Sequence, residues 1–451
     1  MTTDTNKIEI LDKEPVGYTM KEAIEEAKRC LHCKIPQCAK GCPIGNNIPE
    51  FIHQVSLGNF GEAINVIREK SNLPAICSRV CPHERQCQGH CILGKKGHAM
   101  NVGKLERFVA DLDNEIHMFQ QKAPAQKRGK VAIIGAGPAG LSAAGDLAMM
   151  GFQVTIYEAE KNGGGVMMYG IPDYRLPKTI VLNEIEKIKD LGVTFEFGAM
   201  IGEDGITVDG LFEQGYDAVF VGTGTMVHGT LDGTPGLESK GVEQGTHLLH
   251  QFNASKIGEV TEDEIPLRKG EKIGVVGGGN TAMDTARTAL RLGGDVTVLY
   301  RRTQEEMPAT FEEYSEAAGE GVKFMWKTTV AEFIPNEEGQ LVKARLNTPD
   351  GEEVKEFDRI FMAVYSKPAH RVILTTHGVE TDEKGYLITS EKPYGMTTRK
   401  GLFAAGDVVH RPQTVVMAMK AGKEVAKGIA EYIDAVKMVE ASEHPVVNKP
   451  E

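Results

Sequence analysis

Apolar and polar residues follow two different periods along this chain. From Ile48 to Lys70, apolar residues recur every three to four positions, which places them on one face of an amphipathic helix. Beyond a polar, Pro-containing stretch at 120–130, short apolar runs alternate with longer helical patterns. The pattern predicts a small helical domain over 1–125, followed by α/β structure.

Two segments of the α/β part share one pattern, Lys130–Glu160 and Lys272–Arg302. Each reads as an apolar strand, a glycine turn, a helix that begins with small residues, and a second β-branched strand. This βαβ unit, present twice, predicts two Rossmann-like nucleotide-binding domains.

Further strands are predicted within Asp217–Thr225 and Phe357–Ser366. Gly401–Ile433 reads as a strand, a Gly-Asp turn and an amphipathic helix, and the polar tail after Met438 is expected to be unstructured. The predicted boundaries of the segments that follow the helical domain are 126–240, 241–366 and 367–451.

Composition narrows the functional classes. The formal net charge of −12 provides no basic field for nucleic acid or an anionic membrane. We find no secretory signal and no apolar run long enough for a membrane span, so we expect a cytoplasmic protein.

The 8 cysteines all fall between Cys30 and Cys91. They form two quartets, C-x2-C-x4-C-x3-C-P and C-x3-C-P-x4-C-x3-C, whose short loops and Cys-Pro turns suit iron–sulfur clusters. Because the fourth cysteine of such a run commonly ligates the other cluster, we predict crossed ligation. The first cluster would take Cys30, Cys33, Cys38 and Cys91; the second would take Cys42, Cys81 and Cys87, with its remaining position open.

Two alternatives remain for these cysteines, structural zinc sites and disulfides. Zinc usually takes paired C-x2-C knuckles, which the second quartet lacks, and a reducing compartment disfavours disulfides. His32, inside the first run, is interpreted as a neighbour of the cluster rather than a ligand.

The first glycine turn, GAGPAG, follows an apolar strand and opens a helix. Gly135 allows the tight turn, Gly137 lets the backbone approach a pyrophosphate, and Gly140 allows close helix packing. Glu158 ends the second strand, where a carboxylate binds ribose hydroxyls and repels a 2′-phosphate. The turn therefore suits FAD or NAD, with a ligand-free Rossmann turn as the alternative.

The second turn, GGGNTA, contains Gly277, Gly279, Asn280 and Thr281, and its partner strand is followed by Arg301 and Arg302. Paired guanidinium groups at this position would bind a 2′-phosphate, so this turn points to NADPH. A solvated charge pair is the alternative.

A third group of residues follows the strand near the C-terminus. The Asp407 carboxylate, after Gly406, can accept a hydrogen bond from a polyol hydroxyl. Thr414 opens a helix whose dipole would stabilise negative charge at a flavin pyrimidine ring. The alternative for these residues is that they are ordinary caps without a ligand.

With these motifs the chain resembles the glutamate synthase small-subunit family. Relatives of that family include the large subunit of NADH-dependent reduced ferredoxin:NADP oxidoreductase, the sulfide dehydrogenase flavin subunit and the N-terminal half of dihydropyrimidine dehydrogenase. The marks are both cysteine quartets, GAGPAG, YGIPDYRLPK, GGGNTAMD, YRRTQEEMPA and AAGDVV.

The resemblance implies a helical domain with two 4Fe-4S clusters, an FAD domain, and an NADPH domain inserted within it. It places Glu106, in the sequence LERF, as the remaining cluster ligand in preference to Cys77, with a solvated helix face as the alternative for Glu106. The FAD residues would be Gly135, Gly137, Pro138, Ala139, Gly140, Glu158, Gly165, Thr223, Gly224, Gly406, Asp407 and Thr414. The NADPH residues would be Gly277, Gly279, Asn280, Thr281, Arg301 and Arg302.

Some stretches depart from the family pattern, GGGVMMYGIP at 163–172 and AVYS at 363–366. The chain also lacks the redox-active dithiol of the disulfide reductases, whose fold it resembles.

The expected function is an oxidoreductase subunit that exchanges hydride between NADP(H) and FAD and passes single electrons through the clusters. No catalytic side chain is assigned, because the flavin carries the hydride chemistry. The partner would be a glutamate synthase large subunit, a ferredoxin:NADP flavoprotein subunit that performs electron bifurcation, or a hydrogenase-like assembly, with ferredoxin as a further partner. The alternative is a non-catalytic electron-relay or scaffold subunit.

Overall fold

A computed structural model describes residues 17–118, 121–202, 205–369 and 371–443 of the chain. Contacts divide it into two compact units. One unit comprises Met168–Lys178 and Val227–Lys367, and the other comprises the rest of the described chain. We call them the inserted unit and the main unit. No helix among the described residues is long and apolar enough to cross a membrane.

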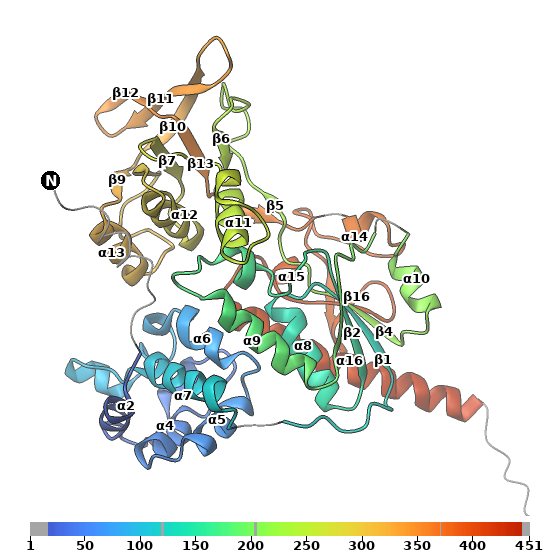
Figure 1. The fold of residues 1–451 in the computed structure, drawn as a ribbon. Helices are drawn as coiled ribbons and strands as arrows, with labels where there is room; N and C mark the ends of the chain where they lie inside the picture. Colours follow the sequence, from blue (N-terminus) through green and yellow to red (C-terminus); the bar gives the residue numbers. More distant parts are fainter. Residues whose placement is uncertain (1–16, 119–120, 203–204, 370, 444–451) are drawn as a thin grey trace, which may run out of the picture. The chain divides into compact units, whose positions relative to one another are not determined.

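The main unit begins with a helical part, which carries every cysteine (Figure 1). The side chain of Thr19 caps its first helix in a reciprocal box with Glu22. The periodic stretch 48–70 forms two helices, because Gly58 between them adopts a positive φ of 76° that ends the first. The helices are α2 (Met20–Ala27), α3 (Gln37–Gly41), α4 (Ile48–Ser56), α5 (Phe60–Arg68), α6 (Pro74–Val80) and α7 (Val102–Ile116), with short 3-10 turns at η1 (His83–Arg85) and η2 (Ile92–Lys96).

The rest of the main unit is built on a seven-stranded sheet of order β15-β16-β17-β4-β1-β2-β3. Its central strands are parallel and mostly apolar, as expected for strands covered on both faces. The strands are β1 (Lys130–Ile134), β2 (Gln153–Glu158), β3 (Thr194–Phe197), β4 (Ala218–Val221), β15 (Thr389–Glu391), β16 (Tyr394–Thr397) and β17 (Leu402–Ala404).

Helices α8 (Pro138–Met149) and α16 (Val415–Glu443) pack side by side along this sheet (Figure 1). The remaining helices here are α9 (Lys178–Lys189), which begins at the last residue of the inserted unit's first segment, α10 (Val208–Glu213), α14 (Arg371–Leu374) and α15 (Asp407–His410). A short π-helical turn, η3 (Val166–Gly170), joins the two units in sequence.

Buried and partly buried polar groups join the helical part to this sheet layer. Asp113 of α7 pairs with Lys187 of α9 at 2.8 Å and with Arg68 of α5 at 3.2 Å. A second set joins residues far apart in sequence: Lys423 of α16 contacts Asp146 of α8 at 2.7 Å and the Asn72 side chain at 2.6 Å. We call these residues the anchor network. They hold the cysteine-bearing helices against the same layer that carries the first glycine turn.

The inserted unit has a five-stranded parallel sheet of order β6-β13-β7-β8-β9 and a three-stranded antiparallel sheet β10-β11-β12. Its strands are β5 (Val227–His228), β6 (Val242–Gln244), β7 (Lys272–Val276), β8 (Asp295–Tyr300), β9 (Lys323–Trp326), β10 (Thr329–Pro335), β11 (Leu341–Thr348), β12 (Gly351–Glu356), β13 (Arg359–Met362) and β14 (Ser366–Lys367). Its helices are α11 (Gly245–Lys256), α12 (Asn280–Arg291), α13 (Phe311–Glu320) and the 3-10 turn η4 (Glu262–Glu264).

Both predicted βαβ units are confirmed, as β1-α8-β2 and β7-α12-β8. The long segment of the inserted unit starts at Val227, where β5 pairs with β14, whereas the sequence suggests 241. The expectation of an unstructured tail after Met438 is wrong as far as Glu443: α16 continues to that residue, and no glycine or proline lies between Met438 and Glu443. Residues 444–451 lie outside the described chain.

Candidate functional site

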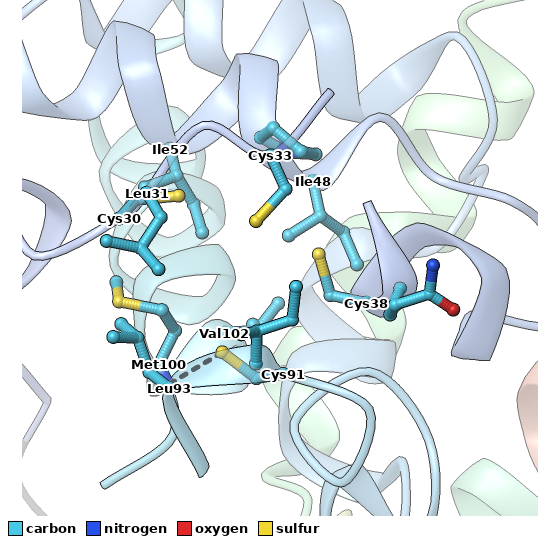
Figure 2. A pocket seen from close by; sticks show the side chains of 13 residues that line it. Cys30, Leu31, Cys33, Cys38, Ile48, Ile52, Cys91, Leu93, Met100 and Val102 are labelled. Atoms are coloured by element: carbon cyan, nitrogen blue, oxygen red, sulfur yellow. Dashed lines mark hydrogen bonds between the residues drawn. The ribbon is translucent and has the colours of Figure 1, made fainter. Parts of the chain in front are cut away.

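The first predicted cysteine set lines a single pocket. Cys30, Cys33, Cys38 and Cys91 surround it, although Cys91 lies far along the chain from the other three. Figure 2 shows their sulfur atoms facing a common space bordered by Ile48 and Val102. Among the described residues, no three His, Cys, Asp or Glu side chains are close enough to hold a single metal ion. Four thiols around a wider space provide the arrangement that a multi-iron cluster needs.

The environment of these thiols suits thiolate ligands. Burial raises the pKa of Cys38 to about 11 and raises the pKa of Cys30, although a backbone N–H of His32 offsets part of the shift at Cys30. All eight thiols are free of disulfides. Metal ions bind the deprotonated sulfur, which burial alone disfavours. The positive charge of the iron in a bound cluster would stabilise these thiolates. The residues present therefore fit an iron–sulfur cluster.

A second group comprises Cys42, Cys81 and Cys87 with the two candidates for the open position, Cys77 and Glu106. Burial raises the pKa of Cys42 and of Cys87, and the negative charge of Glu106 acts on both. Cys81 also has a raised pKa, first because it hydrogen-bonds Cys77 and then because it is buried. The fold therefore brings together the residues that the sequence assigns to a second cluster.

Glu106 and Cys77 reach this group from different helices. Glu106, on α7, is buried, and burial raises the pKa of its carboxyl to about 8. Cys77, on α6, is buried too, and its thiol lies 3.2 Å from the Met419 Sδ. Both remain candidates for the fourth ligand position on geometry alone.

The first glycine turn joins β1 to α8 in the main unit. Gly135 has a positive φ of 102°, and a Cβ there would meet the Gly222 carbonyl oxygen at 2.8 Å. A Cβ on Gly140 would lie 2.0 Å from the Gly135 carbonyl oxygen, so only glycine fits. Gly137 caps α8, directly before Pro138 and Ala139. The helix N-terminus is therefore open to an anionic ligand.

Glu158, at the end of β2, faces this turn. Its carboxylate accepts hydrogen bonds from the backbone N–H of Ala136 at 2.7 Å and of Glu160 at 3.0 Å. Burial raises its pKa, although these two donors oppose the shift. The carboxylate is held beside the phosphate-binding turn with further acceptor capacity on both oxygens.

The other residues assigned to FAD surround the same turn. A Cβ on Gly165 would meet the Gly137 Cα at 3.1 Å, and one on Gly135 would meet the Thr223 Cα at 3.3 Å. Gly224 follows with a positive φ of 66°. Segments far apart in sequence thus converge on the end of β1.

The Gly-Asp turn reaches this place from the C-terminal side. A Cβ on Gly406 would lie 3.1 Å from the Ala139 Cβ. Asp407 accepts a hydrogen bond from the Gln413 N–H at 3.2 Å, and burial raises its pKa to about 6. The Thr414 hydroxyl, directly before α16, is buried with no hydrogen-bond partner among the described residues. A polar ligand at this point would satisfy it.

The second glycine turn joins β7 to α12 in the inserted unit. A Cβ on Gly277 would meet the Ala363 carbonyl oxygen at 2.3 Å, and one on Gly278 would meet the Tyr300 ring at 2.5 Å. Gly279 caps α12, which begins with Asn280 and Thr281, and nothing lies within 4 Å of the place where its Cβ would be. The approach to this helix N-terminus is open.

Arg301 and Arg302 follow β8 directly and are exposed, and neither forms an ion pair with another described residue. The loop after them turns back to the glycines: the Ala309 N–H donates to the Gly278 carbonyl at 3.0 Å, and the Tyr300 hydroxyl donates to the Glu306 carbonyl at 2.9 Å. The turn and the two guanidinium groups therefore belong to one local structure.

The residues of YGIPDYRLPK, for which the sequence indicates no specific role, lie in the inserted unit. Arg175 pairs with Asp284 of α12 at 2.5 Å and with Glu313 of α13 at 2.9 Å, while Arg291 lies 3.7 Å from the centroid of the Tyr174 ring. Lys178 is buried, and burial lowers its pKa to about 7. The sequence signal that could have drawn attention to this segment is an arginine and a lysine within an apolar, Pro-containing stretch.

Comparison with known protein families divides the chain in the same way. The family described as dihydropyrimidine dehydrogenase domain II, 4Fe-4S cluster, matches residues 7–118. The pyridine nucleotide-disulphide oxidoreductase family matches residues 129–422. The chain therefore has an N-terminal 4Fe-4S domain followed by an NAD(P)-dependent oxidoreductase fold.

Individual proteins match over nearly the whole length. The NADPH glutamate synthase small chain of Halomonas elongata is 34% identical over 437 residues, covering 92% of each chain. The NAD-dependent dihydropyrimidine dehydrogenase subunit PreT of Escherichia coli is 33% identical, covering 94% of this chain and 97% of its own. The solved thioredoxin reductase of Lactococcus lactis superposes with a TM-score of 0.53 at 22% identity, over 68% of this chain and 99% of its own, and shows the fold alone.

Proposed function

The chain belongs to the glutamate synthase small-chain family of oxidoreductases, and from this we propose that it exchanges hydride between NADP(H) and FAD and passes single electrons through two 4Fe-4S clusters to or from a partner. The observation that supports this most strongly is the pocket where Cys91 joins Cys30, Cys33 and Cys38. Disulfide pairing would not require four thiols around one space, and a zinc site would require them within reach of a single ion, which no three described His, Cys, Asp or Glu side chains are.

For the second cluster we propose Cys42, Cys81, Cys87 and Glu106 as ligands. The contact between Cys77 and Met419 supports Glu106 over Cys77, because it gives the Cys77 thiol a partner outside this group. Glu106 is buried beside the other three, where its carboxylate would have no solvent to stabilise it without a cation.

FAD would lie along the first glycine turn. Gly135, Gly137, Pro138, Ala139 and Gly140 would bind its pyrophosphate at the N-terminus of α8, with Gly165, Thr223 and Gly224 beside them. Glu158 would accept hydrogen bonds from the adenosine ribose and Asp407 from the ribityl chain. The partnerless hydroxyl of Thr414, after Gly406, would bond the pyrimidine end.

NADPH would lie along the second turn. Gly277, Gly279, Asn280 and Thr281 would hold its pyrophosphate, and Arg301 and Arg302 would bind its 2′-phosphate. The two exposed guanidinium groups beside the turn support NADPH over NADH. Bound FAD supplies the chemistry that converts a hydride into single electrons, so the chain's residues need only bind and orient the nucleotides.

A partner protein would complete the reaction. The two similar proteins are named as a small chain and a subunit, which supports a subunit role here. The proposed partners are a glutamate synthase large subunit, a ferredoxin:NADP flavoprotein subunit or a hydrogenase-like assembly. The clustered free thiols support a reducing compartment such as the cytoplasm.

Anaerobic titration of the purified chain with NADPH tests this proposal. We expect the flavin absorbance to bleach and an electron paramagnetic resonance (EPR) signal from reduced clusters to follow, with NADH much less effective. A chain that holds clusters but no flavin, or a flavin that NADPH does not bleach, would favour the non-catalytic relay subunit instead.

A further inference from the structure

The loops around the first cysteine set expose apolar side chains. Leu31, Ile35 and Ile92 are 55%, 63% and 38% exposed. Leu31 and Ile92 also line the pocket of Cys30, Cys33, Cys38 and Cys91, and Leu31 lies beside Cys30 in Figure 2. Single exposed apolar residues are common, but a group above a candidate redox site marks an interaction surface.

The same loops are strongly basic. Segments 28–49 and 91–104 contain no Asp or Glu, on a chain whose net charge is −12. Arg29 links the two segments, because its guanidinium donates to the His98 carbonyl at 2.8 Å while it pairs with Glu26. The basic residues of these segments are Lys28, Arg29, Lys34, Lys40, Lys95, Lys96 and Lys104.

Three of these lysines lie in the same short stretches of chain as the exposed apolar residues. Lys34, Lys95 and Lys96 are exposed, and none of them forms an ion pair with another residue that the structure describes. We call the exposed residues Leu31, Ile35, Ile92, Lys34, Lys95 and Lys96 the cluster face. An apolar group with charged residues around it matches the apolar core and polar rim of protein interfaces.

A simpler explanation is that the lysines only offset the negative charge of a thiolate-ligated cluster. That explanation accounts for the basic residues, but it leaves the exposed Leu31, Ile35 and Ile92 without a role. A docking surface accounts for both observations.

We propose that the cluster face docks a small acidic protein that carries a one-electron redox centre. The inference rests on the proposed function, because it requires a cluster behind this face. One electron passes between the cluster and the centre of the partner, so that one is oxidised as the other is reduced, and no bond forms or breaks. Opposite charge would accelerate the encounter and orient the partner, and the apolar residues would hold it.

The test uses the anaerobically purified holoprotein and two probes of similar size, an acidic ferredoxin and the basic cytochrome c. Binding is measured by calorimetry at about 0.01 M and 0.15 M ionic strength, where the screening length falls from about 30 Å to about 8 Å. We expect only the ferredoxin to bind, and its affinity to fall at least tenfold (~10×) at the higher salt.

Charge reversal locates the surface. Lys34→Glu with Lys95→Glu and Lys96→Glu should weaken ferredoxin binding by about tenfold or more at low salt. The double variant with only Lys95→Glu and Lys96→Glu keeps Lys34, the neighbour of Cys33, and should therefore lose less affinity for ferredoxin. The matched control reverses three exposed lysines near the β15-β16 hairpin, Lys384, Lys392 and Lys400, and should leave affinity within about twofold.

Iron content and the cluster EPR signal confirm that each variant keeps its clusters. Three results would each overturn the proposal: a loss of affinity in the Lys384, Lys392 and Lys400 control equal to that in the Lys34, Lys95 and Lys96 variant, an affinity that does not change with salt, or equal binding of cytochrome c. If ferredoxin fails to bind while NADPH still bleaches the flavin, the docking inference fails and the proposed function stands.

Discussion

The thiol of Cys77 on α6 lies 3.2 Å from the thioether sulfur of Met419 on α16. Both side chains are buried, and the residues are far apart in sequence. Cys77 also hydrogen-bonds Cys81, a proposed cluster ligand. Since Thr414 directly precedes α16, one helix connects the second cysteine group with the proposed flavin end.

Truncating Met419 should destabilise the main unit. Met419→Ala removes a fully buried side chain, so we expect the free energy of unfolding to fall by about 2 to 5 kcal/mol. Met419→Leu, which conserves volume, should cost less than about 1.5 kcal/mol. Urea denaturation followed by circular dichroism measures both. Met417→Ala, a half-buried position on the same helix, is the control and should cost less than Met419→Ala.

Separate substitution of the two candidate ligands should have unequal effects on the second cluster. We expect Glu106→Ala to lose iron or to change the EPR spectrum of the reduced clusters, because an oxygen ligand would be missing. Cys77→Ser should keep the iron content and the spectrum of the unmodified protein. The opposite outcome, an altered spectrum only in Cys77→Ser, would make Cys77 the ligand.

Removing the two arginines after β8 should reduce the preference for NADPH. A hydrogen bond to a charged group contributes about 1.5 to 3 kcal/mol, so Arg301→Ala and Arg302→Ala should each raise the KM for NADPH by roughly tenfold or more. The KM for NADH serves as the internal control and should change by less than about twofold, since NADH has no 2′-phosphate. Parallel losses with both nucleotides would show that the arginines act on folding or on the shared pyrophosphate.

The inserted unit should become more stable as pH rises above neutral. Burial lowers the pKa of Lys178 to about 7, from an ordinary 10.5. Between these values the unfolded chain binds a proton that the folded chain does not, so the free energy of unfolding rises with pH, by up to roughly 5 kcal/mol. The single tryptophan, Trp326 in β9 of the same unit, reports the transition by fluorescence.

Two variants isolate the lysine's contribution to that pH dependence. Lys178→Met should flatten the rise between pH 7 and 10, because the buried amine is gone. Lys189→Met, on the same helix but paired with Glu186, should retain it. A rise of equal size in Lys178→Met would assign the effect to other groups.

Local geometry explains why both glycine turns could be predicted from sequence. Gly135 and Gly277 lie within short segments whose strand, turn and helix signals are adjacent, and both adopt the positive φ that glycine favours. The spacing of the cysteines also indicated that Cys91 belongs with Cys30, and the fold places both at one pocket.

Long-range partners could not be predicted in this way. Arg175 meets Asp284 and Glu313 more than a hundred residues away, and no local period encodes that pairing. Cys77 and Met419 are related only through the packing of α6 on α16. The apolar period continues across Gly58, so the period alone does not indicate that one helix ends there and another begins.

The anchor network has a consequence for the modularity of the protein. Cut out alone, residues 17–118 would expose the faces of α5 and α7 and leave the buried carboxylate of Asp113 without Lys187. Asn72 would likewise lose its contacts with Asp146 and Lys423. The cysteine-bearing helices are therefore not a module that can be detached like a ferredoxin. A transfer of these helices to another flavoprotein would also have to transfer the residues of α8, α9 and α16 that they contact.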